Sequence, residues 1–549
     1  MHRKVLGLAV VAAIAIAACG GDDDDGGGAS ETAAEGSEAP SAGSEAPAGS
    51  EAPAGSEAPA GTEASEGSEA PAGEAVEGGE VVIALEAEPR TLDPQITQDG
   101  QMRRVAENIF ERLVDRDLDD PGTLVPRLAA ELPTNIDETT WEVKLREGVT
   151  FQNGEPFNAE SAAWSINREI DPEYDSELLS QVSTITGAEA VDEYTVRITT
   201  DGPDPVLPSR LYMIQQVPLE YSKDEAFARN PIGTGPYKFV EWAAGDQITI
   251  EANEDYWGEA PSIEKATFRF LPENQSRIAA LQSGEVDLAM AIPPESAEDV
   301  PQTITRDGLE YPYIRLKNYE GPFQNEQVRL ALAHALNVPQ YIESIYGGNA
   351  TQAQCQTNGP AVFGFNPDLQ PYEYDPELSK QLLEEAGYNG EPARIIAPTG
   401  RWLKFEELAE AIQADMDAVG LNATIEMIQF DPWLTEFIQH IGEGQPDGAL
   451  SSTSNELLDG DRISSLVGES GSVSSFDSPE LEAQLAEART ELDTDAREAA
   501  YQAVAKEICD TAANIALLTF QDIYGASEEL EWTPRIDGTS RVEEMTITN

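Results

Sequence analysis

The sequence predicts an α/β fold with more than one lobe. The chain has 549 residues, and roughly 470 of them follow a low-complexity N-terminal tract, which is too many for a single hydrophobic core. Beyond that tract, segments in which apolar and polar residues alternate, as in strands, interleave with segments of helical periodicity up to the C-terminus. This interleaved order favours α/β lobes over a β-sandwich.

The N-terminus has the layout of an export signal. A basic start that includes Arg3 and Lys4 precedes an apolar stretch, which runs to Ala18 and is too short to span a bilayer. The sequence "IAAC" ending at Cys19 resembles the lipobox of bacterial lipoproteins. This resemblance implies that residues 1–18 are a signal peptide and that Cys19 carries two acyl chains, which would anchor the protein to the outer face of the cell membrane. An ordinary cleaved signal with an unmodified cysteine is the alternative.

Residues 19–80 are expected to form a disordered acidic tether. "GSEAPA" recurs there with a period of six, and large apolar residues are almost absent until Val81. Such a tract cannot bury enough apolar surface to offset the entropy of folding. A coil of this length reaches on the order of 45 Å. A glycosylated stalk is the alternative, although serine and threonine are sparse.

The charge of the chain limits its partners. The formal net charge is −69, so the surface repels phosphate backbones, and we expect no nucleic-acid partner.

The two cysteines that follow Cys19 are Cys355 and Cys509. In an exported chain, two cysteines form either a disulfide or two buried thiols, and the oxidising compartment and the even count favour the disulfide. Neither cysteine has a CxxC partner, so a redox or zinc site is not expected.

Several segments predict individual elements. "GEVVIALEAEP" and "EYTVRITT" have the composition and alternation of strands. "FQNEQVRLALAHALN" has an apolar helical face that includes Val328 and Leu332, with Asn325 as N-cap. A second helix begins at the Asp375 cap with Pro376 in its first turn, and Gly387 ends it.

Common catalytic motifs are absent from the sequence. It contains no GxSxG, HExxH or GxxxxGK[ST] motif. The two histidines beyond the signal are His334, beside an apolar helix face where we expect a structural role, and His440, which has no ligand-spaced partner. A carboxylate pair could still hydrolyse glycosides, but 102 acidic residues make linear proximity of two carboxylates uninformative. We therefore expect no enzyme activity, metal or cofactor.

A series of motifs in fixed order resembles one family. "VVIALEAEPRTLDPQ" and "LVPRLAAELPTNIDETTWEVKLREGVTFQNGEPFNAESAAWSI" are similar to the opening strand and the longest signature of the extracellular solute-binding proteins of family 5, the dipeptide- and oligopeptide-binding components of ABC importers. Further similar segments follow in the expected order: "VDEYTVRI", "PIGTGPYKFVEW", "NEDYWGEAPSIEKATFRF", "RIAALQSGEVDLA", "PFQNEQVRLALAHALN" and "YDPELSKQLLEEAGY".

The resemblance implies an α/β, two-lobed, periplasmic-binding-protein-like (type II) fold with an extra small domain inserted in the first lobe. By analogy, lobe I comprises residues 81–115, 205–305 and 521–549, the extra domain 116–204, and lobe II 306–520. The family captures peptides or other small solutes between its lobes by hinge closure and delivers them to a permease with its ATPase. A monomer is expected.

The resemblance also gives candidate ligand contacts. "SSTSNELLDGD" stands where relatives have a tryptophan and an amine-binding aspartate, and Glu456 takes the place of that aspartate. Asp459 and Asp461 are further candidates in this stretch. Thr453 replaces the tryptophan, so an oligopeptide or another small polar solute fits as well as a dipeptide. A carboxylate facing an ammonium group makes a strong charge-assisted contact.

Four other residues are candidates for the lining of the cleft. Asp99 and Gln101 follow the "LDP" loop, in a segment that reaches the cleft in relatives. Trp402 and Trp433 could each supply an aromatic wall, with core packing as the alternative for both. A surface receptor or sensor on the same scaffold is the alternative to an importer's binding protein, and an exported hydrolase is a third possibility.

Overall fold

The computed structural model describes residues 78–438, 444–467, 473–474 and 476–548. The expected signal peptide, Cys19, the tether up to residue 77 and His440 lie outside these residues. The first strand, β1 (Gly79–Leu85), begins before the boundary expected at residue 80.

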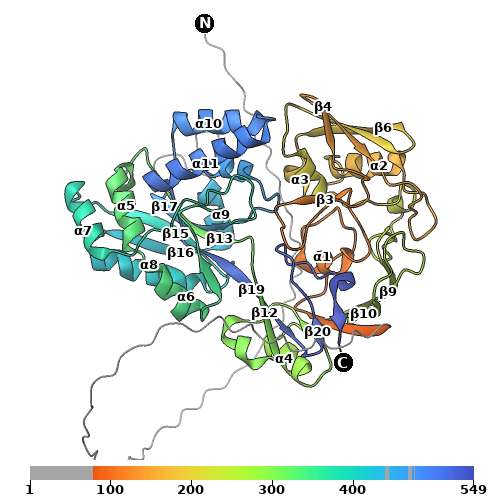
Figure 1. Ribbon diagram of the computed structural model, residues 1–549. Helices are drawn as coiled ribbons and strands as arrows, with labels where there is room; N and C mark the ends of the chain where they lie inside the picture. The colour runs from red at the N-terminus through yellow and green to blue at the C-terminus, as the bar shows by residue number, and fades with distance from the viewer. Residues whose placement is uncertain (1–77, 439–443, 468–472, 475, 549) are drawn as a thin grey trace, which may run out of the picture. The chain divides into compact units, whose positions relative to one another are not determined.

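An eight-stranded sheet forms the first large unit (Figure 1). β1 lies between β10 and β11 and runs parallel to both, and its side chains Val81 and Ile83 are fully buried. This confirms the strand predicted from "GEVVIALEAEP". The sheet has the order β12 (Gln302–Asp307), β19 (Leu518–Ala526), β11 (Leu288–Ala289), β1, β10 (Ile263–Phe270), β9 (Gln247–Ala252) and β8 (Tyr237–Ala243), with β14 (Ala350–Gln352) paired to β19.

A smaller antiparallel sheet lies within the segment proposed as the extra domain. Its order is β4 (Thr134–Asp137), β5 (Thr140–Lys144), β7 (Thr195–Thr200) and β6 (Ile185–Asp192). Val196 and Ile198 of β7 are fully buried, whereas Thr199, the residue after Ile198, is exposed. This confirms the alternation predicted for "EYTVRITT". Helix α2 (Ala159–Glu169) packs against β6 and β7.

A five-stranded sheet forms the second large unit. Its order is β16 (Ala423–Gln429), β15 (Ala393–Thr399), β17 (Gly448–Thr453), β13 (Tyr311–Leu316) and β18 (Asn514–Ala516). β15 runs parallel to β16 and β17, whereas β13 is antiparallel to both of its neighbours. Figure 1 shows the helices of this unit around the sheet: α5 (Glu326–Ala335), α6 (Val338–Tyr346), α7 (Pro376–Glu385), α8 (Phe405–Val419), α9 (Phe430–Ile438), α10 (Pro479–Thr490) and α11 (Thr494–Thr511).

The two predicted helices have the predicted caps. The Asn325 side chain accepts a hydrogen bond from the backbone N–H of Gln327 at the start of α5. The Asp375 side chain caps α7 and Pro376 is its first residue. Gly387 follows α7 with φ +66°, a left-handed conformation that glycine adopts without strain. His334 is half-buried, and its Nδ1 atom lies 2.8 Å from the carbonyl oxygen of Glu373. This contact fits the structural role expected for His334.

The remaining elements are short. They are α1 (Gly100–Ala106), α3 (Leu207–Tyr212), α4 (Asn274–Gln282), β2 (Val114–Arg116) paired with β3 (Leu124–Pro126), and β20 (Leu530–Glu531) paired with β21 (Thr546–Ile547). Short 3-10 segments are η1 (Leu179–Gln181), η2 (Tyr221–Lys223), η3 (Pro294–Asp299), η4 (Pro322–Gln324), η5 (Gly460–Ser465) and η6 (Val542–Glu544).

Apart from the short strand β14, which pairs with the start of β19, the chain passes twice between the two large sheets. β12 belongs to the first sheet and β13 to the second, so residues 308–310 form one connection. β18 belongs to the second sheet and β19 to the first, so Leu517 forms the other. These crossings lie close to the limits proposed for lobe II, 306 and 520.

A disulfide joins Cys355 to Cys509, whose Cα atoms are 5.2 Å apart. It ties the segment after β14 to the last turns of α11, and the Tyr372 hydroxyl donates a 2.6 Å hydrogen bond to the carbonyl oxygen of Cys509. Of the helices described, none has the length and apolar character that crossing a membrane requires.

Candidate ligand-binding site

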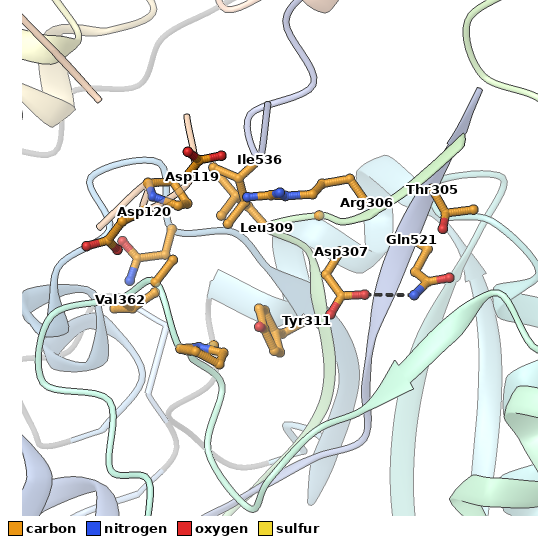
Figure 2. A pocket seen from close by; sticks show the side chains of 16 residues that line it. Asp119, Asp120, Thr305, Arg306, Asp307, Leu309, Tyr311, Val362, Gln521 and Ile536 are labelled. Atoms are coloured by element: carbon orange, nitrogen blue, oxygen red, sulfur yellow. Dashed lines mark hydrogen bonds between the residues drawn. The ribbon is translucent and has the colours of Figure 1, made fainter. Parts of the chain in front are cut away.

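Two cavities border the first crossing between the sheets. The large cavity has a volume of about 520 Å³ (Figure 2) and the small cavity about 330 Å³. Both are lined by Gly308, Leu309, Gln521 and Ile536, so they adjoin one another. Their combined size is typical of sites for small ligands.

The walls of the cavities come from both large units. The β2–β3 turn contributes Asp119 and Asp120 to the large cavity, facing Val362 of the second unit. This turn approaches the second unit closely, because a Cβ atom added to Gly122 would lie 2.8 Å from the carbonyl oxygen of Ala361. Glycine is therefore required at that position.

Glu456 lines the small cavity and is half-buried. It lies on the loop that follows β17, where the hydroxyl of Ser454 donates a 2.6 Å hydrogen bond to its Oε1 atom. Its backbone carbonyl accepts a 2.8 Å hydrogen bond from Arg116 Nη2. The carboxylate has no ion pair with any residue in the part of the chain that the structure describes, so it can still receive an ammonium group.

A second carboxyl group stands near Glu456. Glu310, which also lines the small cavity, accepts a 2.5 Å hydrogen bond from the Ser452 hydroxyl. Burial raises the pKa of Glu310; the Ser452 hydrogen bond opposes this, and the negative charge of Glu456 adds to it. A cation bound between the two carboxyl groups would favour the charged form of both.

Arg103 and Asp537 also line the small cavity and form an ion pair with each other. Arg103 Nη2 lies 2.8 Å from Asp537 Oδ2, and the Tyr212 hydroxyl donates a 2.5 Å hydrogen bond to the same carboxylate. Burial alone would raise the pKa of Asp537, but Arg103 and these contacts hold it well below its usual range. Asp537 therefore stays ionised and keeps Arg103 engaged.

Asp459 and Asp461 lie outside the lining of both cavities. Asp459 is buried and forms a bidentate ion pair with Arg497, at 2.8 and 2.5 Å. It also accepts a 2.9 Å hydrogen bond from the backbone N–H of Asp461 at the start of η5. Asp461 itself pairs with Arg489 at 2.7 Å. Both carboxylates are thus engaged within the protein.

Asp99 and Gln101 lie at the start of α1, outside both cavities. The Asp99 side chain accepts a 3.0 Å hydrogen bond from the backbone N–H of Gln101 and so caps the helix. The Gln101 side chain accepts a 3.3 Å hydrogen bond from Arg104. The sequence resemblance therefore identified the helix that reaches the site, but the residue of α1 that lines the small cavity is Arg103.

The two candidate tryptophans pack together within the second unit. Trp433 is buried, with its ring stacked on Phe437 at 4.6 Å between centroids. Trp402 packs edge-on against Trp433 at 5.8 Å and against Phe405 at 4.9 Å. Neither lines the large or the small cavity, whereas the neighbouring Leu403 is 46% exposed and lines the small one.

Sequence reasoning missed several residues of the lining. Glu310 and Arg306 lie next to the first crossing and Asp522 lies on β19 near the second. The only signal in the sequence is their place next to the expected lobe boundaries, because the crossings bring these segments together. No group of described histidine, cysteine, aspartate and glutamate side chains could hold a metal ion.

Comparison with known proteins identifies the family of the chain. Residues 123–474 match the family described as "Bacterial extracellular solute-binding proteins, family 5 Middle". The glutathione-binding protein GsiB of Shigella flexneri serotype 5b is 30% identical over 357 residues, which are 63% of this chain and 69% of the relative. GsiB of Pectobacterium atrosepticum is 32% identical over 319 residues, which are 56% of this chain and 61% of the relative.

Solved structures share the fold. HbpA2 from Haemophilus parasuis superposes with a TM-score of 0.78 at 23% identity, covering 86% of this chain and 100% of that one. DppA from Helicobacter pylori, in complex with the peptide STSA, has a TM-score of 0.66 at 25% identity, covering 86% and 99%. These matches confirm the fold class and the family that the ordered motifs predicted. The chain belongs to the bacterial extracellular solute-binding proteins of family 5.

Proposed function

We propose that this chain captures a peptide, or a related small polar solute, in the small and large cavities and delivers it to a membrane permease. Glu456 receives the ammonium group of the ligand. The hinge lies at the two crossings between the sheets, and closure around the ligand favours the form that docks on the permease. The ligand is released unchanged.

The family sets the frame of this proposal. As a family 5 solute-binding protein, the chain is a substrate-binding component of an ABC importer of the peptide-binding type. Relatives and structural neighbours carry the names of glutathione- and peptide-binding proteins. Glutathione and the peptide STSA both contain peptide bonds, and this shared chemistry supports a peptide as the ligand here.

One observation carries the role of Glu456. Its carboxylate lines the small cavity, accepts a hydrogen bond from the Ser454 hydroxyl and has no ion pair among the described residues, while Asp459 and Asp461 of the same stretch are engaged by arginines. Arg103 in the same cavity is paired with Asp537, so the Glu456 carboxylate, which also lies near the apolar side chains Leu403 and Phe520, gains from binding an ammonium group.

The test is calorimetric titration of the purified full-length chain with peptides whose N-terminus is either free or acetylated. We expect the free amine to bind about tenfold or more tightly, since a hydrogen bond to a charged group contributes about 1.5–3 kcal/mol. Glu456→Gln should remove most of this difference. The control is Glu410→Gln, an exposed glutamate of α8 outside both cavities. Equal binding of acetylated and free peptides by the unmodified chain would disprove the proposed role of Glu456.

The anchoring of the chain is a separate part of the proposal. The protein acts on the outer face of the cell membrane as a monomer, held by lipid on Cys19, with the residues between Cys19 and β1 as the tether. Cys19→Ser should move the protein from the membrane to the soluble extracytoplasmic fraction. A protein that stays soluble before this substitution would contradict the anchor, while ligand binding would be unaffected.

A further inference from the structure

Glu169 is a buried carboxyl group that the proposed function does not use. It is the last residue of α2, it is fully buried, and it has no ion pair with any residue in the described part of the chain. A buried carboxylate without a cation is costly, so such a group either keeps its proton or needs strong donors around it. The contacts of Glu169 show which of the two forms the surrounding structure favours.

The charged and titratable groups around Glu169 pair with one another. Arg168, its neighbour on α2, donates hydrogen bonds of 3.1 and 2.5 Å to the two carboxylate oxygens of Asp93. Arg168 donates a third hydrogen bond, of 2.7 Å, to the side-chain oxygen of Gln95. The Tyr174 hydroxyl donates a 2.8 Å hydrogen bond to Asp93 as well. Arg168 is therefore committed to Asp93 and not to Glu169.

Ser176 relates the protonation of Glu169 to the hydrogen bonds around it. The Ser176 Oγ atom lies within hydrogen-bond distance of Glu169 Oε1 and, at 2.7 Å, of the carbonyl oxygen of Gln95. It also accepts a 3.0 Å hydrogen bond from the backbone N–H of Leu178. A hydroxyl group has a single proton, so it donates either to the carbonyl or to a carboxylate. When Glu169 is protonated, its own O–H donates to Oγ, and all three contacts are hydrogen bonds.

Ionisation of Glu169 breaks this arrangement. The carboxylate then takes the Ser176 proton, because a hydrogen bond to a charged acceptor is stronger than one to a carbonyl. The carbonyl oxygen of Gln95, a fully buried residue, loses this donor, and an unpaired buried polar group is costly. Burial raises the pKa of Glu169 to about 8; the Ser176 hydroxyl and Arg168 oppose this shift, and the charge of Asp93 adds to it.

Two segments meet at this hydrogen bond: 174–178, which follows α2, and 93–98, which precedes α1. At the exposed end of their contact, the Glu177 carboxylate accepts hydrogen bonds of 2.8 and 3.0 Å from the Thr97 hydroxyl and the backbone N–H of Gln98. The buried end depends on the serine hydroxyl. Because α1 contributes to the lining of the small cavity, the contact between the two segments bears on the candidate site.

We infer that Glu169 and Ser176 form a proton-dependent link between these two segments: the protonated carboxyl group keeps the buried end of the contact closed, and its ionisation opens it. The segments are therefore held together tightly in acidic and neutral solution and more loosely in alkaline solution. The opening is local, because the exposed hydrogen bonds of Glu177 do not depend on this proton.

The test is hydrogen–deuterium exchange of the full-length chain, read by mass spectrometry at about pH 6 and about pH 9 and corrected for the intrinsic exchange rate at each pH. We expect the protection of segment 93–98 to fall about tenfold or more at the higher pH, as the loss of one buried hydrogen bond predicts. Glu169→Gln should keep this protection at both pH values, because its amide N–H can donate to Ser176 as the protonated carboxyl does. Ser176→Ala should have low protection at both.

The matched control is Glu173→Gln, at an exposed position of the loop after α2. It should lose protection at the higher pH as the unmodified chain does. Equal protection of segment 93–98 at both pH values in the unmodified chain would overturn the inference, and this comparison needs no substitution. If the pH dependence persists in Glu169→Gln or in Ser176→Ala, another titrating group opens the contact and the inference is wrong. The experiment uses no ligand, so its result is independent of the proposed function.

Discussion

Arg116 Nη2 donates a 2.8 Å hydrogen bond to the carbonyl oxygen of Glu456, which joins the β2–β3 hairpin to the loop that carries the proposed amine-binding residue. Arg116 is itself buried, with its guanidinium over the ring of Tyr212 at 4.5 Å. The backbone of the Glu456 loop is therefore held by the β2–β3 hairpin while Glu456 lines the small cavity.

The first prediction concerns this positioning contact. Arg116→Met leaves the Glu456 carbonyl without its donor, and we expect peptide affinity to fall about fivefold to tenfold, the value of one hydrogen bond. The preference for a free over an acetylated N-terminus should remain, because the Glu456 side chain is unchanged. Calorimetric titration measures both, and Arg116→Lys should recover part of the affinity. Loss of the amine preference in Arg116→Met would show that Arg116 acts on the ligand itself.

The second prediction concerns Asp459 and Arg497. Both side chains are buried, so Asp459→Ala leaves an unpaired guanidinium in the interior, which costs about 3–5 kcal/mol of stability. Urea unfolding should show this loss, whereas Asp495→Asn, at an exposed position of α11, should change stability by less than about 0.5 kcal/mol. If Asp459 instead contacted the ligand, its replacement would reduce affinity in the folded protein with little loss of stability.

The third prediction concerns the pH dependence of stability. Glu169 at the end of α2 is fully buried, and burial raises the pKa of its carboxyl to about 8, although the Ser176 hydroxyl and Arg168 oppose the shift. Its Oε2 atom has no hydrogen-bond partner among the described groups. The folded protein thus keeps a proton that the unfolded chain releases near pH 4.5, so this group lowers stability progressively as the pH rises from there to about 8.

Glu169→Gln removes this titration. The variant should match the unmodified protein near pH 4.5 and exceed its stability at pH 8 by on the order of 4 kcal/mol. Thermal melting over this pH range measures the difference. Glu173→Gln, at an exposed site nearby, should leave the profile unchanged. A constant difference between Glu169→Gln and the unmodified protein at every pH would contradict the assignment.

The fourth prediction concerns the disulfide. Cys355 and Cys509 are 154 residues apart, and a loop of that length restricts the unfolded chain by about 5 kcal/mol in the chain-entropy model. The double variant Cys355→Ala, Cys509→Ala should unfold at clearly lower urea concentration, with unchanged peptide affinity where it is folded. Neither cysteine lines the large or the small cavity, so a change in affinity would contradict a purely stabilising role of the bond.

Local features of the fold could be predicted from the sequence because their causes are local. Asn325 and Asp375 cap their helices through backbone groups two or three residues away, so the sequence alone contains both partners. The family could be predicted because its motifs occur in order, and the comparisons confirm it.

The site could be predicted only in part, because it depends on contacts between distant segments. Glu310 and Arg306 reach the cavities because the chain crosses between two sheets there, and among 102 acidic residues nothing local distinguishes Glu310 from the others. Asp459 had the right type and place in the sequence for a ligand contact, but Arg497, 38 residues away, engages it. Pairing with a distant arginine cannot be read from spacing.

The buried ion pair between Asp459 and Arg497 has a consequence for how the solute preference of such a protein can evolve. Asp459 is three residues from Glu456 on the same loop, yet one is fixed in the interior and the other faces an open cavity. Stability and selectivity are thereby assigned to separate positions of one short segment. If Glu456 has the role proposed above, a change of side chain at position 456 alters the solute that the protein prefers and leaves the buried ion pair of Asp459 and Arg497 in place. A single substitution on this loop would then be enough to give a related binding protein a different solute.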